Sequence, residues 1–294
     1  MRQAAALAAL VFVTLPLTAC GGGGSSSSSS GSVVSPSLAD AATNSSSKSS
    51  VQMNMQLTMT STQIGQPLTI SLAGQMDNAH RRGHFTIDMS ELADLAGGSG
   101  TSPSDWKGEE VVDAANGKLV VYMRLPFLTR VIPGGKPWVK LDVTAAGRKL
   151  GVDFSQLTQL MGNPAEMLDW LRATSGNVTK VGEERVGGEE TTHYRATVDL
   201  QKYPNLLPAD RRAAARRAVQ TLIRLTHVRT YPVDAWVGKD GLIRKMALHF
   251  TESIRGQRLS LGMLTWFHGF GAPVTVTIPP PNQTTDLSAP TGGR

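Results

Sequence analysis

The histidines are the side chains of this sequence whose chemistry could serve catalysis or metal binding, but their spacing supports neither. His80 and His84 are expected on one face of a strand together with Arg82. A metal ion there would need further ligands and would be repelled by the adjacent positive charge, so we interpret the group as a solvated basic edge. The remaining histidines are scattered at no diagnostic spacing: His193, His227, His249 and His268.

The acidic residues and glycines likewise form no catalytic motif. Glu109-Glu110 is expected to be the solvated start of a strand, and Asp240-Gly241 a hairpin turn, rather than acid–base pairs. The sequence contains no Gly-x-Ser-x-Gly, His-Glu-x-x-His or dinucleotide-binding glycine motif. We predict no catalytic residue, no metal site and no cofactor. An enzyme becomes a serious alternative if the fold brings two of the four scattered histidines close to a carboxylate.

The N-terminal residues carry the most specific motif. Arg2 precedes an apolar run over 4–17, which ends in Leu17-Thr18-Ala19-Cys20 with the single cysteine of the chain. This order is typical of a bacterial lipobox, whose cysteine thiol is acylated before the signal peptidase cuts. We expect residues 1–19 to be a lipoprotein signal peptide and Cys20 to be lipidated. The alternative is an ordinary secretory signal with an incidental cysteine.

Such an anchor would place the protein at the outer face of the cytoplasmic membrane. More than one acyl chain makes the attachment stable, because each buried methylene contributes about 0.8 kcal/mol. After Cys20, the Gly/Ser-rich residues up to 50 offer few apolar side chains to bury, so residues 20–50 are expected to form a flexible tether around a short amphipathic turn over 38–42. We assign the folded domain to 51–281 and an irregular tail to 282–294.

Composition excludes several protein classes. With 40% apolar residues among 294, the chain is not disordered throughout, and one cysteine allows no disulfide within it. A mean hydropathy of −0.13 argues against a polytopic membrane protein.

The net charge of +6 is concentrated in a predicted helix over 208–225. Its densest basic cluster is Arg211, Arg212, Arg216 and Arg217, with Arg224 further along the helix. Nucleic acid is not expected as a partner, because no reader motif accompanies the arginines of a chain predicted to be exported. The cluster is either a solvated helix face or a contact for anionic lipid headgroups, at about 1 kcal/mol per basic residue near the surface.

Alternation of apolar and polar residues begins abruptly at residue 51 and predicts a sheet. Strands are expected over 51–60, 68–76, 84–89, 111–114, 119–125, 138–143, 178–186, 191–200, 233–237, 242–251 and 258–267. Asn116-Gly117 favours a tight hairpin turn between two of them. Apolar spacing predicts helices over 154–161, 164–176 and 208–225. Many antiparallel strands with few helices indicate a single α+β domain with one curved sheet.

Methionine and leucine side chains on these elements are the candidates for a ligand cavity. Methionine is unbranched and polarizable, so it suits a surface that must fit variable apolar partners, although a loosely specified core would use it too. The candidates are Met53, Met55, Leu57 and Met59 on the first strand, Phe154, Leu157, Leu160, Met161, Met167 and Leu171 around the first two helices, and Val219 and Leu222 on the third.

The order of these segments resembles a known superfamily. The segments that carry the resemblance are the Ser-rich tether before an alternating strand, Asn163-Pro164-Ala165-Glu166, the stretches 181–188 and 191–199, the hairpin from 232 to 246, and Ile278-Pro279-Pro280-Pro281. Together they are similar to the actinobacterial lipoproteins of the LolA/LppX-like (LprG-like) superfamily, over nearly the whole mature chain.

The resemblance implies a strongly curved antiparallel half-barrel with helices packed on its concave face. Relatives bind acyl chains in that apolar cavity and carry lipids, lipoproteins or glycolipids, and the superfamily has no catalytic motif to transfer. We therefore expect a monomeric, membrane-anchored carrier of a lipid or glycolipid. Because other members bind regulatory membrane proteins, an envelope interaction module is the alternative, and a hydrolase without a recognisable motif comes third.

Overall fold

The computed structural model describes residues 35–61, 65–93, 102–115, 118–132, 136–149, 171–207, 209–226, 228–254 and 257–288. Cys20, the signal segment, Asn116-Gly117, the predicted helix over 154–161 and most of the one over 164–176 lie outside these ranges. Among the candidate cavity residues, Phe154, Leu157, Leu160, Met161 and Met167 therefore lie outside the described residues.

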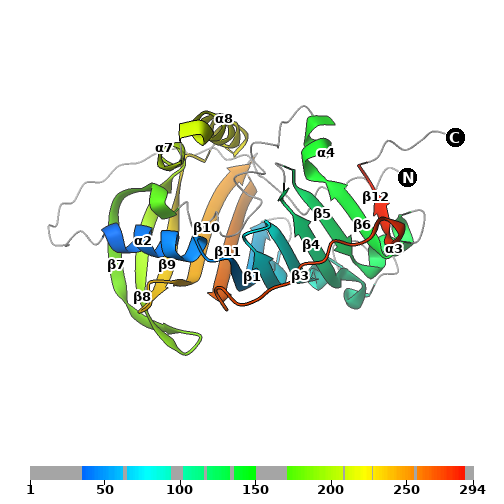
Figure 1. The fold of residues 1–294 in the computed structure, drawn as a ribbon, viewed down its shortest axis with the longest axis horizontal. Helices are drawn as coiled ribbons and strands as arrows, with labels where there is room; N and C mark the ends of the chain where they lie inside the picture. Colours follow the sequence, from blue (N-terminus) through cyan, green and yellow to red (C-terminus); the bar gives the residue numbers. More distant parts are fainter. Residues whose placement is uncertain are drawn as a thin grey trace.

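One twelve-stranded sheet organises the described residues, as predicted (Figure 1). Its spatial order is β12-β6-β5-β4-β3-β2-β1-β11-β10-β9-β8-β7, so the sheet is unclosed and ends at β12 and β7. All neighbours pair antiparallel except β12 and β6, which are parallel. The strands are β1 (Ser50–Ser61), β2 (Leu68–Asp77), β3 (Arg82–Asp88), β4 (Lys107–Asp113), β5 (Val120–Arg124), β6 (Trp138–Asp142), β7 (Thr174–Val186), β8 (Glu189–Asp199), β9 (Thr230–Gly238), β10 (Ile243–Ile254), β11 (Gln257–His268) and β12 (Thr284–Asp286).

Two meanders make up this sheet. Strands β1 to β6 follow one another in space as they do in the chain, and so do β7 to β11. The meanders join where β1 pairs with β11, in an uninterrupted register from Gln52 opposite His268 to Ser61 opposite Leu259. The sheet is therefore continuous although its two halves come from separate parts of the sequence.

Short helices complete the described fold. They are α2 (Ser35–Ser46), α3 (Pro126–Val131), α4 (Val143–Lys149), α7 (Tyr203–Leu206) and α8 (Ala209–Thr226), with 3-10 turns η2 (Ser90–Leu92), η3 (Pro103–Trp106), η5 (Leu171–Ala173) and η6 (Pro281–Gln283). Helix α8 confirms the helix predicted over 208–225, whereas the prediction that a helix extends to Gly176 was wrong. Strand β7 already begins at Thr174. None of the helices in the described ranges is long and apolar enough to cross a membrane.

Helix α2 lies inside the range that we expected to be tether. It crosses in front of β7 to β10 in Figure 1, and its Leu38, Ala41 and Ala42 are almost completely buried. Ser45 Oγ also accepts a hydrogen bond from the Ile243 amide at 2.9 Å. The expected tether thus includes a helix that packs in the core, and it is longer than the short amphipathic turn expected over 38–42, because its apolar side chains are few and small.

Alternation along the strands separates an apolar face from a polar one. Phe85 on β3 shows how closely the apolar face is packed, because its ring covers two glycines of the sheet. A Cβ added at Gly74 would lie 2.8 Å from Phe85 Cδ1, and one added at Gly83 would overlap the same ring. Small residues here leave room for the ring and help the sheet to curve toward its apolar face.

Two clusters of buried side chains lie on the apolar face. Cluster 1 includes α2, residues of β7 to β10 and the first part of β1, with Leu38, Met53, Leu171, Ala196 and Met246 among its members. Cluster 2 is formed mainly by β3, β5, η3 and α3, and includes Trp106 stacked on Phe127 with ring centroids 4.2 Å apart. The core is therefore divided between the two halves of the sheet.

The segment after β11 crosses the sheet to its far edge. Figure 1 shows it running in front of β3, β4 and β5 to η6 and β12. The Gly271 amide bonds to Ser50 O at 2.9 Å, and Gln75 Nε2 donates to Thr275 O at 3.1 Å. Residues 284–286 then form β12 beside β6, within the tail that we expected to be irregular. We call residues 269–283 the strap.

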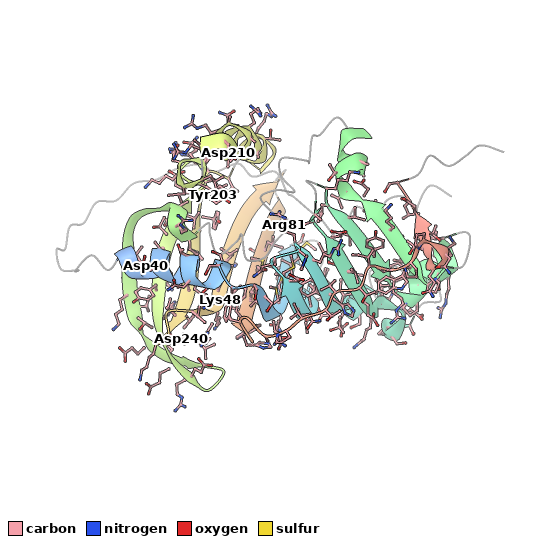
Figure 2. The ribbon with its side chains drawn as sticks, in the orientation of Figure 1. Asp40, Lys48, Arg81, Tyr203, Asp210 and Asp240 are labelled. Atoms are coloured by element: carbon pink, nitrogen blue, oxygen red, sulfur yellow. The ribbon has the colours of Figure 1, made fainter. Side chains whose placement is uncertain are left out.

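Replacing Leu38 tests whether α2 is part of the core. Leu38→Ala should lower the free energy of unfolding by about 2–5 kcal/mol, because it removes buried methyl groups and leaves a cavity. The exposed Asp40 on the same helix (Figure 2) is the matched control, and Asp40→Ala should change stability by no more than about 0.5 kcal/mol. Urea unfolding measures both, and equal effects of the two changes would contradict the packing of α2.

Candidate functional site

The middle of the apolar face carries half-buried apolar side chains between the two core clusters. Met55 lies opposite Leu72 and Thr265, and Leu57 lies opposite Ile70 and Met263. We call the half-buried residues of this region the central stripe: Met55, Leu57, Met59, Ile70, Leu72, Leu261 and Met263. Met263 packs against cluster 1, Met59 and Ile70 against cluster 2, and Leu72 against both.

The structure separates the candidate cavity residues into two groups. Met55, Leu57 and Met59 share the central stripe, where part of each side chain stays exposed. Met53, Leu171 and Val219 instead lie within cluster 1, with 1%, 1% and 4% of their surfaces exposed. The first strand therefore passes from core into a partly open surface along its length. Leu222 belongs to α8, but its side chain is outside the described part of the structure.

The basic helix α8 sits at one end of the strands. Figure 2 places Asp210 of α8 near Tyr203 of α7, at the opposite end from the β9–β10 turn with Asp240. The side chains of Arg212, Arg216 and Arg217 are exposed, and that of Arg211 is not described. Arg212 Nε donates to Leu207 O at 2.8 Å and Arg216 Nη2 to Asn205 Oδ1 at 3.1 Å. These two guanidinium groups make no ion pair within the described ranges.

The prediction that Glu109 and Glu110 are both solvated was wrong for Glu110. Glu109 lies on the polar face, where it forms an ion pair with Arg124 and lies 3.3 Å from His84 Nε2. Burial opposes ionisation, but these partners outweigh it and hold the pKa of Glu109 below its usual range. Glu110 points to the other face, because neighbouring residues of a strand alternate in direction, and only 7% of its surface is exposed.

Glu110 is a carboxyl group among apolar side chains. Its partners on the neighbouring strands are Phe85 and Met123. Burial raises its pKa to about 7. Among the described residues, its Oε2 has no hydrogen-bond partner, and the buried Thr265 Oγ1 opposite Met55 has none either. The described part of the apolar face thus holds two buried oxygen atoms without partners, and neither was predicted from the sequence.

On the polar face, His193 is held between two carboxylates. Its Nδ1 lies 2.9 Å from Glu184 Oε1 and its Nε2 lies 2.7 Å from Asp234 Oδ1. Its ring stacks on Trp236, with centroids 4.2 Å apart, and Trp236 Nε1 donates to Glu184 Oε2 at 2.7 Å. The network therefore ties β7, β8 and β9 together.

Within the described residues, this network brings one of the scattered histidines to carboxylates, whereas our condition for an enzyme requires two. Of the four scattered histidines, His193 meets carboxylates, whereas His249 Nε2 lies 3.1 Å from the Thr251 hydroxyl. His227 lies outside the described residues, and His268 lines a groove. That groove of about 380 Å³ lies on the polar face and is lined mainly by Gln52, Asn54, Gln75, His84, Thr86 and His268. No group of three potential metal ligands occurs in the ranges that the structure describes.

The comparisons with known proteins give one partial sequence match and several solved structures of low sequence identity. No family model matches the sequence. A curated Streptomyces griseus protein, an uncharacterized 31.2 kDa protein of the rplA–rplJ intergenic region, is 30% identical over 159 residues. The match covers 52% of this chain and 49% of that protein, so it spans about half the length of the relative.

The similar solved structures include lipoprotein LppX from Mycobacterium tuberculosis, with 12% identity and a TM-score of 0.45 over 83% of this chain and 97% of that one. LprF from Mycobacterium bovis has 13% identity and a TM-score of 0.43 over 83% and 96%. A LolA superfamily protein from Nitrosomonas europaea has 7% identity and a TM-score of 0.26 over 81% and 93%. The fold itself, one large and mostly antiparallel open sheet with few helices, is shown by the strand pairing.

The buried carboxyl of Glu110 predicts a pH dependence of stability. Its pKa is about 7 in the folded chain and 4.5 in a model peptide, so the folded state binds more protons between these pH values. The free energy of unfolding should therefore fall by about 3 kcal/mol as the pH rises from 4.5 to above 7. Glu110→Gln should remove this fall in urea unfolding across the pH range.

Glu109→Gln is the control, because Glu109 lies on the same strand but faces the other way. Because the pKa of Glu109 is lowered in the folded chain, its effect on the free energy of unfolding has the opposite pH dependence: its stabilising contribution is lost as the pH falls. Parallel stability curves for wild type and Glu110→Gln would contradict the burial of an ionisable Glu110.

Proposed function

We propose that this protein is an extracytoplasmic, lipid-anchored protein that binds the acyl chains of a lipid or glycolipid on the central stripe. The observation that carries the proposal is the incomplete burial of apolar side chains from β1, β2 and β11 between two well-buried clusters. Contiguous apolar side chains that folding leaves partly accessible form a surface suited to an apolar partner. The resemblance described from the sequence implies the same class of ligand.

Burial of the acyl chain supplies the binding energy in this proposal. About ten methylenes removed from water contribute roughly 8 kcal/mol before the entropic cost of association. Methionine side chains at Met55, Met59 and Met263 can adjust to chains of different length and saturation. Little directional bonding is needed for the apolar part of the ligand.

Attachment to the membrane would come from acylated Cys20 and would place the protein at the outer face of the cytoplasmic membrane. In this arrangement, the exposed arginines Arg212, Arg216 and Arg217 of α8 could contact anionic headgroups, as could Arg211 on the same helix. The carrier would then meet its lipid donor at a membrane surface. This role needs no enzymatic step.

Lipid retained during purification tests the proposed ligand. We expect the chain from residue 20 on, produced in a bacterial host and purified without detergent, to show adducts of lipid mass by native mass spectrometry. Solvent extraction then identifies the lipid class. An apo mass with no uptake of added phospholipid or glycolipid would contradict the carrier and favour an envelope protein as the partner.

Charges on the central stripe should prevent uptake. The double change Met55→Asp with Leu57→Asp should reduce bound lipid at least tenfold, because two carboxylates would be desolvated beside the acyl chain. Gln56→Asp is the matched control, since Gln56 lies between them but is exposed on the other face. Circular dichroism monitors folding. Lipid uptake by a folded double variant equal to that of the control would contradict the site.

Replacing the cysteine tests the anchor separately. Cys20→Ser should remove acylation, because serine offers no thiol for the lipid, and metabolic labelling with a radioactive fatty acid should lose its signal completely. Ser25→Ala is the control, since Ser25 follows the lipobox in the Gly/Ser-rich run, and it should keep the label. Labelling that survives Cys20→Ser would refute the predicted lipobox.

A further inference from the structure

Glu110 lies where the two core clusters meet. Phe85, its partner on β3, belongs to cluster 1, and Met123, its partner on β5, belongs to cluster 2. Val112 follows Glu110 on the same face of β4 and packs against both clusters, as Leu72 of the central stripe does. The carboxyl group therefore sits at the boundary of the two clusters, on the face to which we assign the acyl chains.

One carboxyl oxygen of Glu110 lacks a hydrogen-bond partner among the described residues. Its Oε2 is buried without a partner among the described residues, and its pKa is affected by burial with no contribution from a charge in those ranges. Buried polar groups in native proteins nearly always have a partner, and leaving one without it is unfavourable. The neighbouring Glu109 shows the usual solution, since it has both Arg124 and His84 as partners.

A ligand is well suited to supply the missing partner. The carboxyl oxygen can accept a hydrogen bond whether the group is neutral or ionised, so a hydroxyl or an ammonium group fits it. An anionic group would be repelled by the ionised form. Above pH 7 the carboxyl group is ionised and can only accept, so a ligand without a donor, such as a methyl ester, would leave Oε2 without a partner there. The competition described below is therefore run above pH 7.

We propose that Glu110 is the specificity-determining residue of the apolar face, an inference that rests on the proposed function. It accepts a hydrogen bond from a donor on the bound amphiphile, a hydroxyl or an ammonium group next to the acyl chain. The apolar side chains hold the tail, and this carboxyl selects which polar group may accompany it. The ligand class is thereby narrowed to acyl lipids with a hydrogen-bond donor near the chain.

Competition between lipids with the same chain tests this selection. The chain from residue 20 on, which includes every residue that the structure describes, is delipidated and incubated with equimolar monooleoylglycerol and methyl oleate. Gel filtration removes unbound lipid, and the bound lipid is extracted and quantified. Wild type should retain about tenfold to a hundredfold more monooleoylglycerol, as expected for one hydrogen bond to a charged or partly charged group. A second mixture pairs oleylamine with methyl oleate.

Substitutions of Glu110 show whether this residue recognises the lipid or only maintains the structure. Glu110→Leu should still bind methyl oleate but lose most of the preference for monooleoylglycerol, because the acceptor is gone and apolar packing remains. Glu110→Gln keeps an acceptor oxygen, so it should retain part of the preference for the hydroxyl lipid and lose most of the preference for the amine. Glu109→Gln, on the same strand and the opposite face, should behave as wild type in both mixtures.

The outcomes distinguish this inference from the function on which it rests. If wild type binds both oleoyl lipids without preference, or if Glu110→Leu keeps the wild-type preference, Glu110 does not select the ligand and the acyl-binding function stands. If wild type binds none of the three lipids, the proposed function fails and the selection fails with it. Should Glu110→Leu not fold, the comparison of Glu110→Gln with Glu109→Gln in the amine mixture decides the matter.

Discussion

The pairing of β1 with β11 is the interaction on which the rest of the structure depends. Each meander alone would be a smaller sheet with one more open edge, and only their junction gives a continuous apolar face. The register of that junction sets which residues face one another, so Leu57 meets Met263 and Met55 meets Thr265. A shift by one residue would turn the apolar side chains of β1 to the polar face. The central stripe is thus a product of strand register.

The two faces of the sheet differ in the partners that they give to acidic and other polar side chains. On the polar face, carboxylates have basic or aromatic partners, as in the contacts of Glu184 and Asp234 with His193 and Trp236. On the apolar face, Glu110 and Thr265 keep buried oxygen atoms without such partners in the described ranges. The contrast makes Glu110 an exception to the way in which this chain places its acidic side chains, and it lies on the same face as the proposed acyl-binding surface.

The strands and their faces could be predicted from the sequence because alternation reports burial directly. Val51 to Thr60 alternates throughout, and β1 covers the same stretch. The full length of α2 and its packing in the core were not predicted beyond a short amphipathic turn over 38–42, because serine and alanine around Leu38 carry little periodic signal. Glu110 was assigned to solvent together with Glu109, as the start of a strand, although it shares its strand face with Val112. Alternation would have indicated its direction, but its burial depends on Phe85 and Met123 from other strands.

The strap has a consequence for the order in which the chain can reach its final form. During synthesis β1 emerges early, but its partner strand β11 emerges only after all the strands from β2 to β10. The strap and β12 come after β11, so the edge of β6 stays open until the last described strand has emerged. Contacts so distant in sequence form slowly and leave strand edges exposed meanwhile. A chain of this topology would benefit from a holding chaperone until its final strand is in place.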